Sequence, residues 1–166
     1  MQRRITLKDN IYLALPFVIM FILYGSSTMT YETQSVVPTL ENLLQNKPFY
    51  SLLSKIEFVY ADAVVSVQEI GYYSFVEFFI RKGAHFFSFF LMSFFWYLGL
   101  RKRVRSNWLI ILLSIMLCTG YASFDELRQT FNPERSGLMI DVILDTAGAV
   151  VGVSIAYFLS KKKIIK

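Results

Sequence analysis

The sequence predicts an all-α membrane protein with four transmembrane helices. Hydrophobic residues make up 55% of the 166 residues and charged residues only 17%, whereas a soluble domain carries about 25% charged residues. Sixteen Phe and ten Tyr are more than a soluble fold of this length can bury, and four apolar runs are long enough for membrane helices. The composition therefore excludes a soluble enzyme and a disordered chain.

The first predicted span covers residues 11–29, which carry no charge and can cross a bilayer at about 1.5 Å per residue. Pro16 lies inside this run, where a kink is tolerated. A cleaved signal peptide is the alternative, with the small residues 25–27 near the cut. The length of the run and the lack of an Ala-x-Ala pattern favour a retained span.

The other three spans are expected in the second half of the chain, at about residues 83–100, 107–123 and 138–159. Basic residues follow the second span at 101–105 and the fourth at 161–166. No repeat or linker divides the sequence, so we interpret residues 1–166 as a single membrane domain.

The distribution of charge predicts the orientation of these spans. The N-terminus, the 101–105 connection and the C-terminus hold eleven Lys and Arg and one acid, whereas the other two connections and their flanks hold six bases and eleven acids. The positive-inside rule then places both termini in the cytoplasm. The basic excess, within a net charge of +5, faces anionic lipid headgroups, so no nucleic-acid partner is expected.

The segment 30–80 lies outside the membrane in this topology, and its pattern favours short amphipathic helices. One is expected to open at residues 35–38 and to continue through Leu40, Leu43 and Leu44. A second is expected over residues 51–67, where apolar residues recur at three- and four-residue steps. Such helices lie on the membrane surface or cap the bundle; a partly ordered loop is the alternative.

Polar and ionisable side chains gather at the outer ends of the second, third and fourth spans. They are Arg81, Lys82, His85, Asp125, Glu126, Gln129, Arg135, Asp141 and Asp145. Asp141 and Asp145 are four residues apart and share a helix face, and a carboxylate at the centre of a membrane helix costs about 2.5–3.5 kcal/mol. We therefore expect both to point into the bundle, where Lys82, His85 or Arg135 neutralises them.

This cluster has two interpretations: a salt-bridge network that locks the spans together, or a ligand or reaction site at the outer interface. The number of ionisable groups favours the site. His85 among several carboxylates also suggests a divalent metal, with Asp141 and Asp145 as its candidate ligands. The His-Glu-x-x-His, Cys-x-x-Cys and Gly-x-Ser-x-Gly motifs do not occur in the sequence, so the familiar hydrolase classes are not indicated.

Small residues form a strip along the fourth span, at Gly148 and Gly152. Such a strip allows close helix contact. Packing within the four-helix bundle is the favoured interpretation, and a homodimer through the two glycines is the alternative. The sequence has one cysteine, Cys118, which excludes an intramolecular disulfide. Because Cys118 lies in an apolar run, we interpret it as a small hydrophobic side chain inside a helix.

These strings resemble the VanZ-like family of small bacterial membrane proteins, named for a teicoplanin-resistance protein. The resemblance rests on three motifs: Arg81-Lys82-x-Ala84-His85-Phe86, Asp125-Glu126-x-x-Gln129-x-Phe131-x-Pro133-x-Arg135-Ser136-Gly137, and Asp141-Val142-x-x-Asp145-x-x-Gly148-x-x-x-Gly152. It is strongest over residues 80–155. The chain departs from the family pattern at Arg128, where many members carry His, and at Glu134, where Gly is common.

The resemblance implies a bacterial plasma-membrane protein that lowers susceptibility to teicoplanin-type glycopeptide or lipoglycopeptide antibiotics. We expect it to bind or rearrange a surface lipid or lipid-linked wall precursor, with Arg81, Lys82 and Arg135 on phosphate. No cofactor is expected other than a divalent metal.

Two further hypotheses stay open. One is a metal-dependent intramembrane enzyme acting on a lipid-linked phosphate, with His85, Asp125 and Glu126 as its catalytic groups. The other is a structural or partner protein whose polar cluster only fixes helix packing.

Overall fold

The structure, a computed structural model, describes residues 5–131, 137–162 and 164. Its contacts divide into two compact units, Met1–Thr28 with His85–Lys166, and Met29–Ala84. We call the first the helical unit and the second the connecting unit. The helix α6 (Tyr72–Leu100) begins in the connecting unit and ends in the helical unit.

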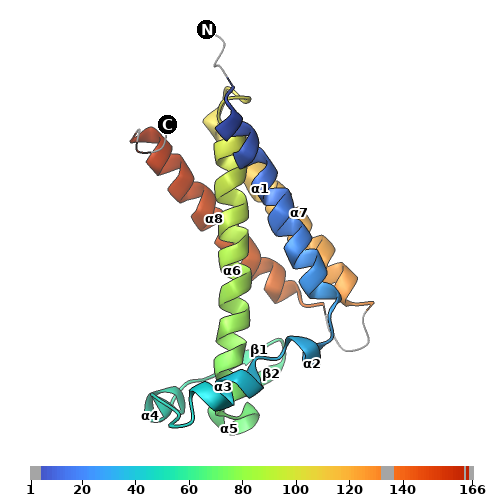
Figure 1. Ribbon diagram of the computed structural model, residues 1–166, viewed down its shortest axis with the longest axis vertical. Coiled ribbons are helices and arrows are strands. Elements are labelled where there is room, and N and C mark those ends of the chain that lie inside the picture. The colour runs from blue at the N-terminus through green and yellow to red at the C-terminus, as the bar shows by residue number, and fades with distance from the viewer. Residues whose placement is uncertain (1–4, 132–136, 163, 165–166) are drawn as a thin grey trace. The chain divides into compact units, whose positions relative to one another are not determined.

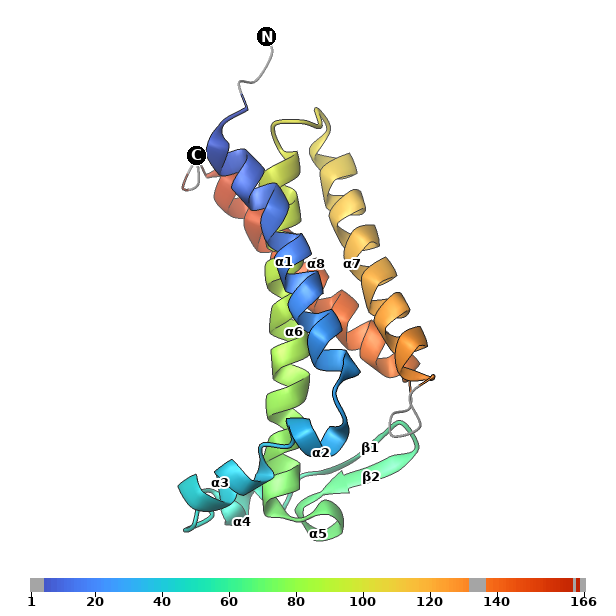
Figure 2. The ribbon, with the colours of Figure 1, turned by 45° about the vertical axis from the view of Figure 1, so that its right-hand side comes forward.

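Four helices of the described chain are long and apolar enough to cross a membrane. They are α1 (Leu7–Thr28), α6, α7 (Asn107–Gln129) and α8 (Met139–Lys161), and they are seen in Figures 1 and 2. The predicted all-α class with four spans is confirmed. Two of the helices are longer than the apolar runs predicted. The helix α6 already begins at Tyr72, directly after Gly71 at φ +81°, and α7 continues to Gln129.

The helical unit packs around a core to which all four helices contribute. Leu23 comes from α1, Met92 and Trp96 from α6, Cys118 from α7 and Ala149 from α8. Cys118 is fully buried, as its apolar surroundings predict. Large apolar side chains such as that of Phe21, 77% exposed, cover the outside of the bundle, as expected where lipid replaces water.

The helix α8 crosses α6 at very short range (Figure 1). Gly148 and Gly152 lie against the backbone carbonyls of Phe86 and Phe90, and a Cβ atom at either glycine would collide with them. The two glycines thus serve packing within one chain. Dimerisation through them stays a prediction.

At one end of the helical unit, the chain connection between α6 and α7 is tied to the start of α1. The buried Asp9 accepts hydrogen bonds from the backbone nitrogen of Thr6 at 2.7 Å and from Lys102 Nζ at 2.9 Å. Arg103 also contacts the side chain of Asn10. We call this the basic end, because α8 ends there at Lys161, with Lys162 as its C-cap, and Arg101 donates to Ser160 on α8.

The connecting unit contains four short helices and one hairpin. The helices are α2 (Tyr31–Gln34), α3 (Val37–Leu43), α4 (Tyr50–Leu53) and α5 (Val67–Ile70), and the strands are β1 (Glu57–Tyr60) and β2 (Ala63–Ser66). The helix expected near residues 35–44 is confirmed as α3. Pro38 lies in its first turn, where proline is well tolerated.

The single helix expected over residues 51–67 is wrong. The strands β1 and β2 pair antiparallel there, with Tyr60 opposite Ala63. Ala61 and Asp62 between them both have positive φ, 51° and 65°, which suits a tight two-residue hairpin turn. The β-branched and aromatic residues in this stretch favour strands, whereas apolar spacing over so few residues fits both a helix and a strand.

A small core holds the connecting unit together. Val65, Val67, Tyr72 and Phe75 form it. Glu77 on α6 is 1% exposed and accepts a hydrogen bond from the backbone nitrogen of Val36 at 2.7 Å. This bond satisfies an amide at the start of α3, which has no side-chain cap of its own.

Candidate functional site

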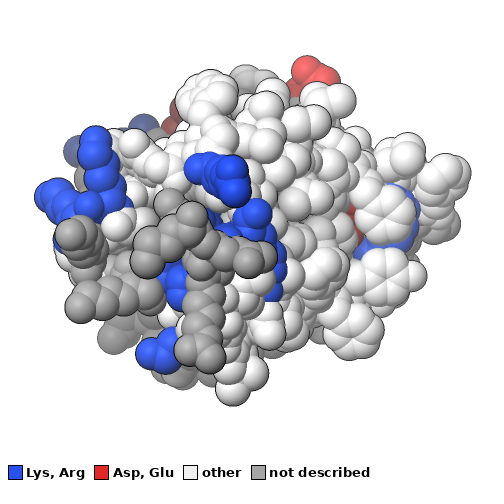
Figure 3. Space-filling model, turned by 90° about the horizontal axis from the view of Figure 1, so that it is seen from above, with Lys and Arg blue, Asp and Glu red and all other residues white. Residues whose placement is uncertain are grey.

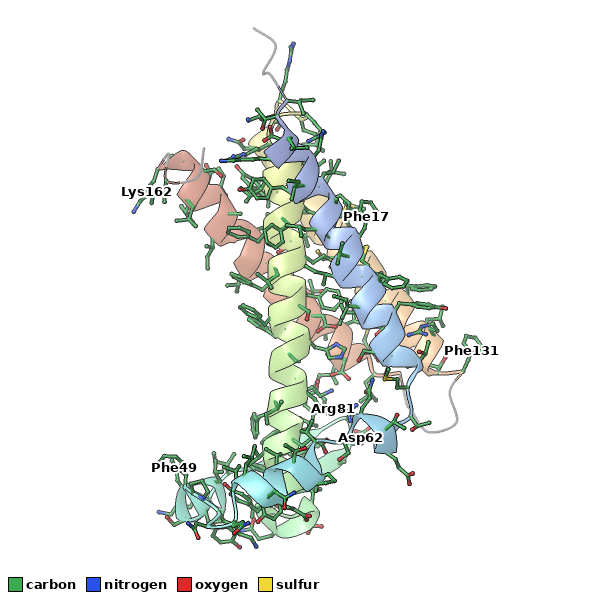
Figure 4. The ribbon with its side chains drawn as sticks, viewed as in Figure 1. Phe17, Phe49, Asp62, Arg81, Phe131 and Lys162 are labelled. Atoms are coloured by element: carbon green, nitrogen blue, oxygen red, sulfur yellow. The ribbon has the colours of Figure 1, made fainter. Side chains whose placement is uncertain are left out.

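The predicted site residues fall in both units of the structure. The helical unit holds His85, Asp125, Glu126, Gln129, Asp141 and Asp145, and the connecting unit holds Arg81 and Lys82. Arg81 lies on α6 and is labelled in Figure 4. Arg135 lies outside the described residues. In the connecting unit, Lys82 Nζ lies 4.8 Å from the ring centroid of Tyr60, a cation–π distance.

Two predicted site residues on different helices, His85 on α6 and Asp145 on α8, lie close together. His85 Nδ1 lies 3.5 Å from Asp145 Oδ2. The Asp145 side chain is 3% exposed and the His85 side chain 34%. A buried carboxylate 3.5 Å from an imidazole nitrogen is close enough to orient the ring. The pair is therefore a candidate for proton exchange or for contact with an anionic ligand.

Asp125 is engaged on both carboxylate oxygens by its own helix. Arg128 Nη2 donates to Oδ1 at 3.1 Å, and Gln129 Nε2 donates to Oδ2 at 3.0 Å. Asp125 is 4% exposed. This carboxylate is thus satisfied within the protein, and Gln129 serves to position it.

Arg128 extends the Asp125 contact to α1. Its guanidinium lies 4.2 Å from the ring centroid of Tyr24, and Nη2 also donates to the Tyr24 carbonyl oxygen at 3.1 Å. Sequence reasoning noted Arg128 as a departure from the family pattern but did not place it or Tyr24 in the site. The spacing of three residues between Asp125 and Arg128 was the available signal for a pair on one helix face.

Glu126 joins the end of α7 to the start of α8. Its Oε2 accepts from the backbone nitrogen of Leu138, the N-cap residue of α8, at 2.8 Å. Gly137 packs onto the same turn of α7, where a Cβ atom would collide with the carbonyl oxygen of Glu126. A carboxylate at a helix N-terminus is favoured by the helix dipole and satisfies an amide there.

Within the helical unit, three local arrangements involve predicted site residues: the His85–Asp145 pair, the Asp125 network and the Glu126 cap. Asp141 lies in the first turn of α8 and is half-buried. Glu126 lies within electrostatic range of Asp125, Asp141 and Asp145. Within the ranges that the structure describes, no group of three or more His, Cys, Asp or Glu side chains is arranged to hold a metal ion. The assignment of a metal to Asp141 and Asp145 stays a prediction.

The sequence of the chain matches a known protein family. The VanZ/LLP1 family model matches residues 11–160. This range includes every residue of the predicted site and all of the four membrane helices except the first four residues of α1 and the last residue of α8. The chain belongs to the VanZ/LLP1 family. The VanZ-like resemblance in the sequence is thereby confirmed, and four apolar helices agree with a VanZ-like membrane protein. Searches of curated proteins and of solved structures found no match to this VanZ-like chain.

Proposed function

We propose that this VanZ-like protein lowers susceptibility to teicoplanin-type glycopeptide or lipoglycopeptide antibiotics. It would do so in the bacterial plasma membrane, with both termini cytoplasmic, by binding or rearranging a surface lipid or lipid-linked wall precursor at an outward-facing polar site. Family membership supports the membrane setting. The observation that carries the site is the buried Asp145 held 3.5 Å from the accessible His85.

The ligand chemistry proposed for this site is an anionic phosphate. His85 carries a positive charge when it is protonated and can then contact a phosphate oxygen. On the strength of the sequence alone, Arg81, Lys82 and Arg135 stay candidate phosphate ligands, with the guanidinium groups suited to bidentate phosphate contact. A non-catalytic role is favoured because Asp125 and Glu126, two of the three candidate catalytic groups, are engaged in contacts within the helical unit.

The alternative proposal is a metal-dependent intramembrane enzyme acting on a lipid-linked phosphate. The His85–Asp145 pair favours it, because a carboxylate-oriented imidazole is a common general base or acid. Asp141 and Asp145 would then hold the metal. Asp145 would then have two roles, because the same carboxylate would bind the metal and orient His85.

Drug susceptibility in cells tests the proposed function. Cells expressing the protein are compared with cells expressing Asp145→Asn or His85→Gln at equal membrane levels, and Glu69→Gln, an exposed acid of the connecting unit, is the matched control. We expect the two site variants to lose protection against teicoplanin while Glu69→Gln keeps it. Full protection in Asp145→Asn would contradict the proposal.

Mass-resolved profiling of envelope lipids and wall precursors in the same cells separates binding from catalysis. Unchanged masses together with altered drug binding at the surface support binding or redistribution. A lipid or precursor whose mass changes only when Asp145 and His85 are intact would instead establish the enzyme and identify its substrate.

A further inference from the structure

The connecting unit carries a strongly exposed apolar surface where the chain turns from α3 to α4. The side chains of Leu43, Phe49 and Leu52 are 74%, 75% and 60% exposed, and Figure 4 shows Phe49 at the edge of the unit. No Asp or Glu occurs in residues 43–55, which we call the apolar segment. Large apolar side chains gathered in this way mark a surface that binds a membrane or a protein.

The inner side of the apolar segment is fastened to the first turn of α6. Tyr72 Oη donates to the carbonyl oxygen of Pro48 at 2.9 Å, and Tyr73 Oη donates to the carbonyl oxygen of Leu44 at 3.4 Å. Leu44 and Leu53 pack against the small core of the unit. One set of apolar side chains in this segment is therefore used in folding, while the three exposed ones stay at the surface.

The backbone at Phe49 has an uncommon conformation. Lys47 and Phe49 have positive φ, 44° and 60°, which residues with bulky side chains seldom adopt. Lys47 Nζ also lies 5.6 Å from the ring centroid of Tyr73, so contacts with α6 hold the turn in this conformation. Because the turn is already ordered, placing Phe49 in a lipid layer costs little conformational freedom.

The membrane is the apolar phase within reach of the apolar segment. The connecting unit joins two membrane helices, since α1 ends at Thr28 and α6 begins at Tyr72. The helix α6 has 29 residues and is therefore about 43 Å long, close to the thickness of about 40–45 Å that a bilayer has with its headgroups. Its first turn, to which the apolar segment is fastened, is thus expected at the level of the headgroups.

The charge at the basic end indicates which leaflet this is. Figure 3 looks onto that end, where Lys and Arg side chains gather, and the positive-inside rule assigns such an end to the cytoplasm. Since α1 starts and α6 ends there, the chain between these two helices belongs to the outer leaflet. Lys47 and Lys55, both exposed, can extend their ammonium groups past the apolar side chains to headgroup phosphates.

We propose that the apolar segment inserts Leu43, Phe49 and Leu52 into the headgroup layer of the outer leaflet, with Lys47 and Lys55 on lipid phosphates. This surface is formed by a turn between two short helices, whereas the sequence suggested amphipathic helices. The inference rests on the membrane spans and not on the ligand proposed for the polar cluster. A protein partner would cover the same side chains, and the experiment below separates it from lipid.

Fluorescence quenching in the full-length protein tests the insertion, with one protein molecule in each nanodisc of phosphatidylcholine and phosphatidylglycerol. An environment-sensitive dye is attached to a cysteine introduced by Phe49→Cys or Leu52→Cys. Glu69→Cys, at an exposed position of the same unit outside the apolar segment, is the matched control. The native Cys118 is fully buried, and the unsubstituted protein measures any labelling there.

The dye is quenched in turn by a lipid with a nitroxide near its headgroup and by a water-soluble nitroxide. We expect the lipid to quench the dye in Phe49→Cys and Leu52→Cys about threefold more than in Glu69→Cys, and the soluble quencher to show the reverse order. Equal lipid quenching in Phe49→Cys and Glu69→Cys overturns the insertion. A dye in Phe49→Cys that neither quencher reaches would be covered by protein, and this result would also overturn it.

Discussion

Ser93 Oγ on α6 lies 2.7 Å from the carbonyl oxygen of Ala149 on α8, to which it donates a hydrogen bond. Both residues are fully buried. A hydroxyl can reach a backbone carbonyl on a neighbouring helix only where the two backbones come close, and Gly152 provides that approach beside Phe90. In a membrane interior, where no apolar driving force brings helices together, such contacts carry much of the association.

A side chain at Gly152 should therefore separate α6 from α8. We expect Gly152→Ala to lower the stability of the purified protein by about 1–3 kcal/mol, the usual cost of overpacking, and thus to lower its thermal midpoint in detergent. Gly120→Ala on α7 is the matched control, because a Cβ there meets nothing within 4 Å. Similar midpoints for both variants would contradict the close crossing.

Arg128 should stabilise the junction of α7 with α1. We expect Arg128→Gln and Tyr24→Leu each to lower the free energy of unfolding by about 1–2 kcal/mol, because each removes the same stacking contact. The double variant should lose less than the sum of the two single losses. Additive losses in thermal or denaturant unfolding would show that the two side chains do not interact.

The buried carboxylate of Asp9 should hold the connection between α6 and α7 against α1. Asp9→Asn keeps the shape of the side chain but removes the negative charge opposite Lys102. We expect a loss of about 1–3 kcal/mol, below the value for a fully buried ion pair because Lys102 is partly exposed. Asp62→Asn, an exposed acid in the hairpin turn, is the control, and an equal effect there would refute the prediction.

Glu126 offers a test that separates a structural role from a functional one. Glu126→Gln keeps an oxygen acceptor for the Leu138 amide, whereas Glu126→Ala does not. If capping α8 is the main role of Glu126, Glu126→Ala should lower the free energy of unfolding by about 1 kcal/mol. Glu126→Gln should lower it clearly less, as measured by thermal unfolding. Loss of drug protection in Glu126→Gln at unchanged stability would instead make the carboxylate charge part of the site.

The candidate site could be predicted in part, because ionisable side chains near membrane helices are costly and therefore stand out in a sequence. His85 and Asp145 were both singled out in this way, and the structure places them 3.5 Å apart. The neighbours of Asp125 were harder to predict. Tyr24 lies about a hundred residues before Arg128 in the chain, and no local pattern connects an aromatic residue on the first span to a base on the third.

The hairpin shows the limit of pattern reasoning in a short segment. In residues 51–67, apolar spacing fits both a helix and two strands, and such short stretches carry too few residues to separate the two periods. The turn could not be predicted from the local pattern, because contacts between the two strands stabilise it. These contacts are the pairing of β1 with β2, and the turn itself holds Ala61 and Asp62 at positive φ.

The sequence by itself determined the all-α class, the four membrane spans and the VanZ-like character, because membrane helices require long apolar runs and make every polar residue within them conspicuous. Only the tertiary structure decided which partner each polar group takes. Asp125 pairs with Arg128, Glu126 caps α8 and Asp145 lies beside His85. Gly148 and Gly152 allow α8 to pack closely against α6. Those choices depend on how closely helices distant in sequence approach one another, and that distance is set by packing.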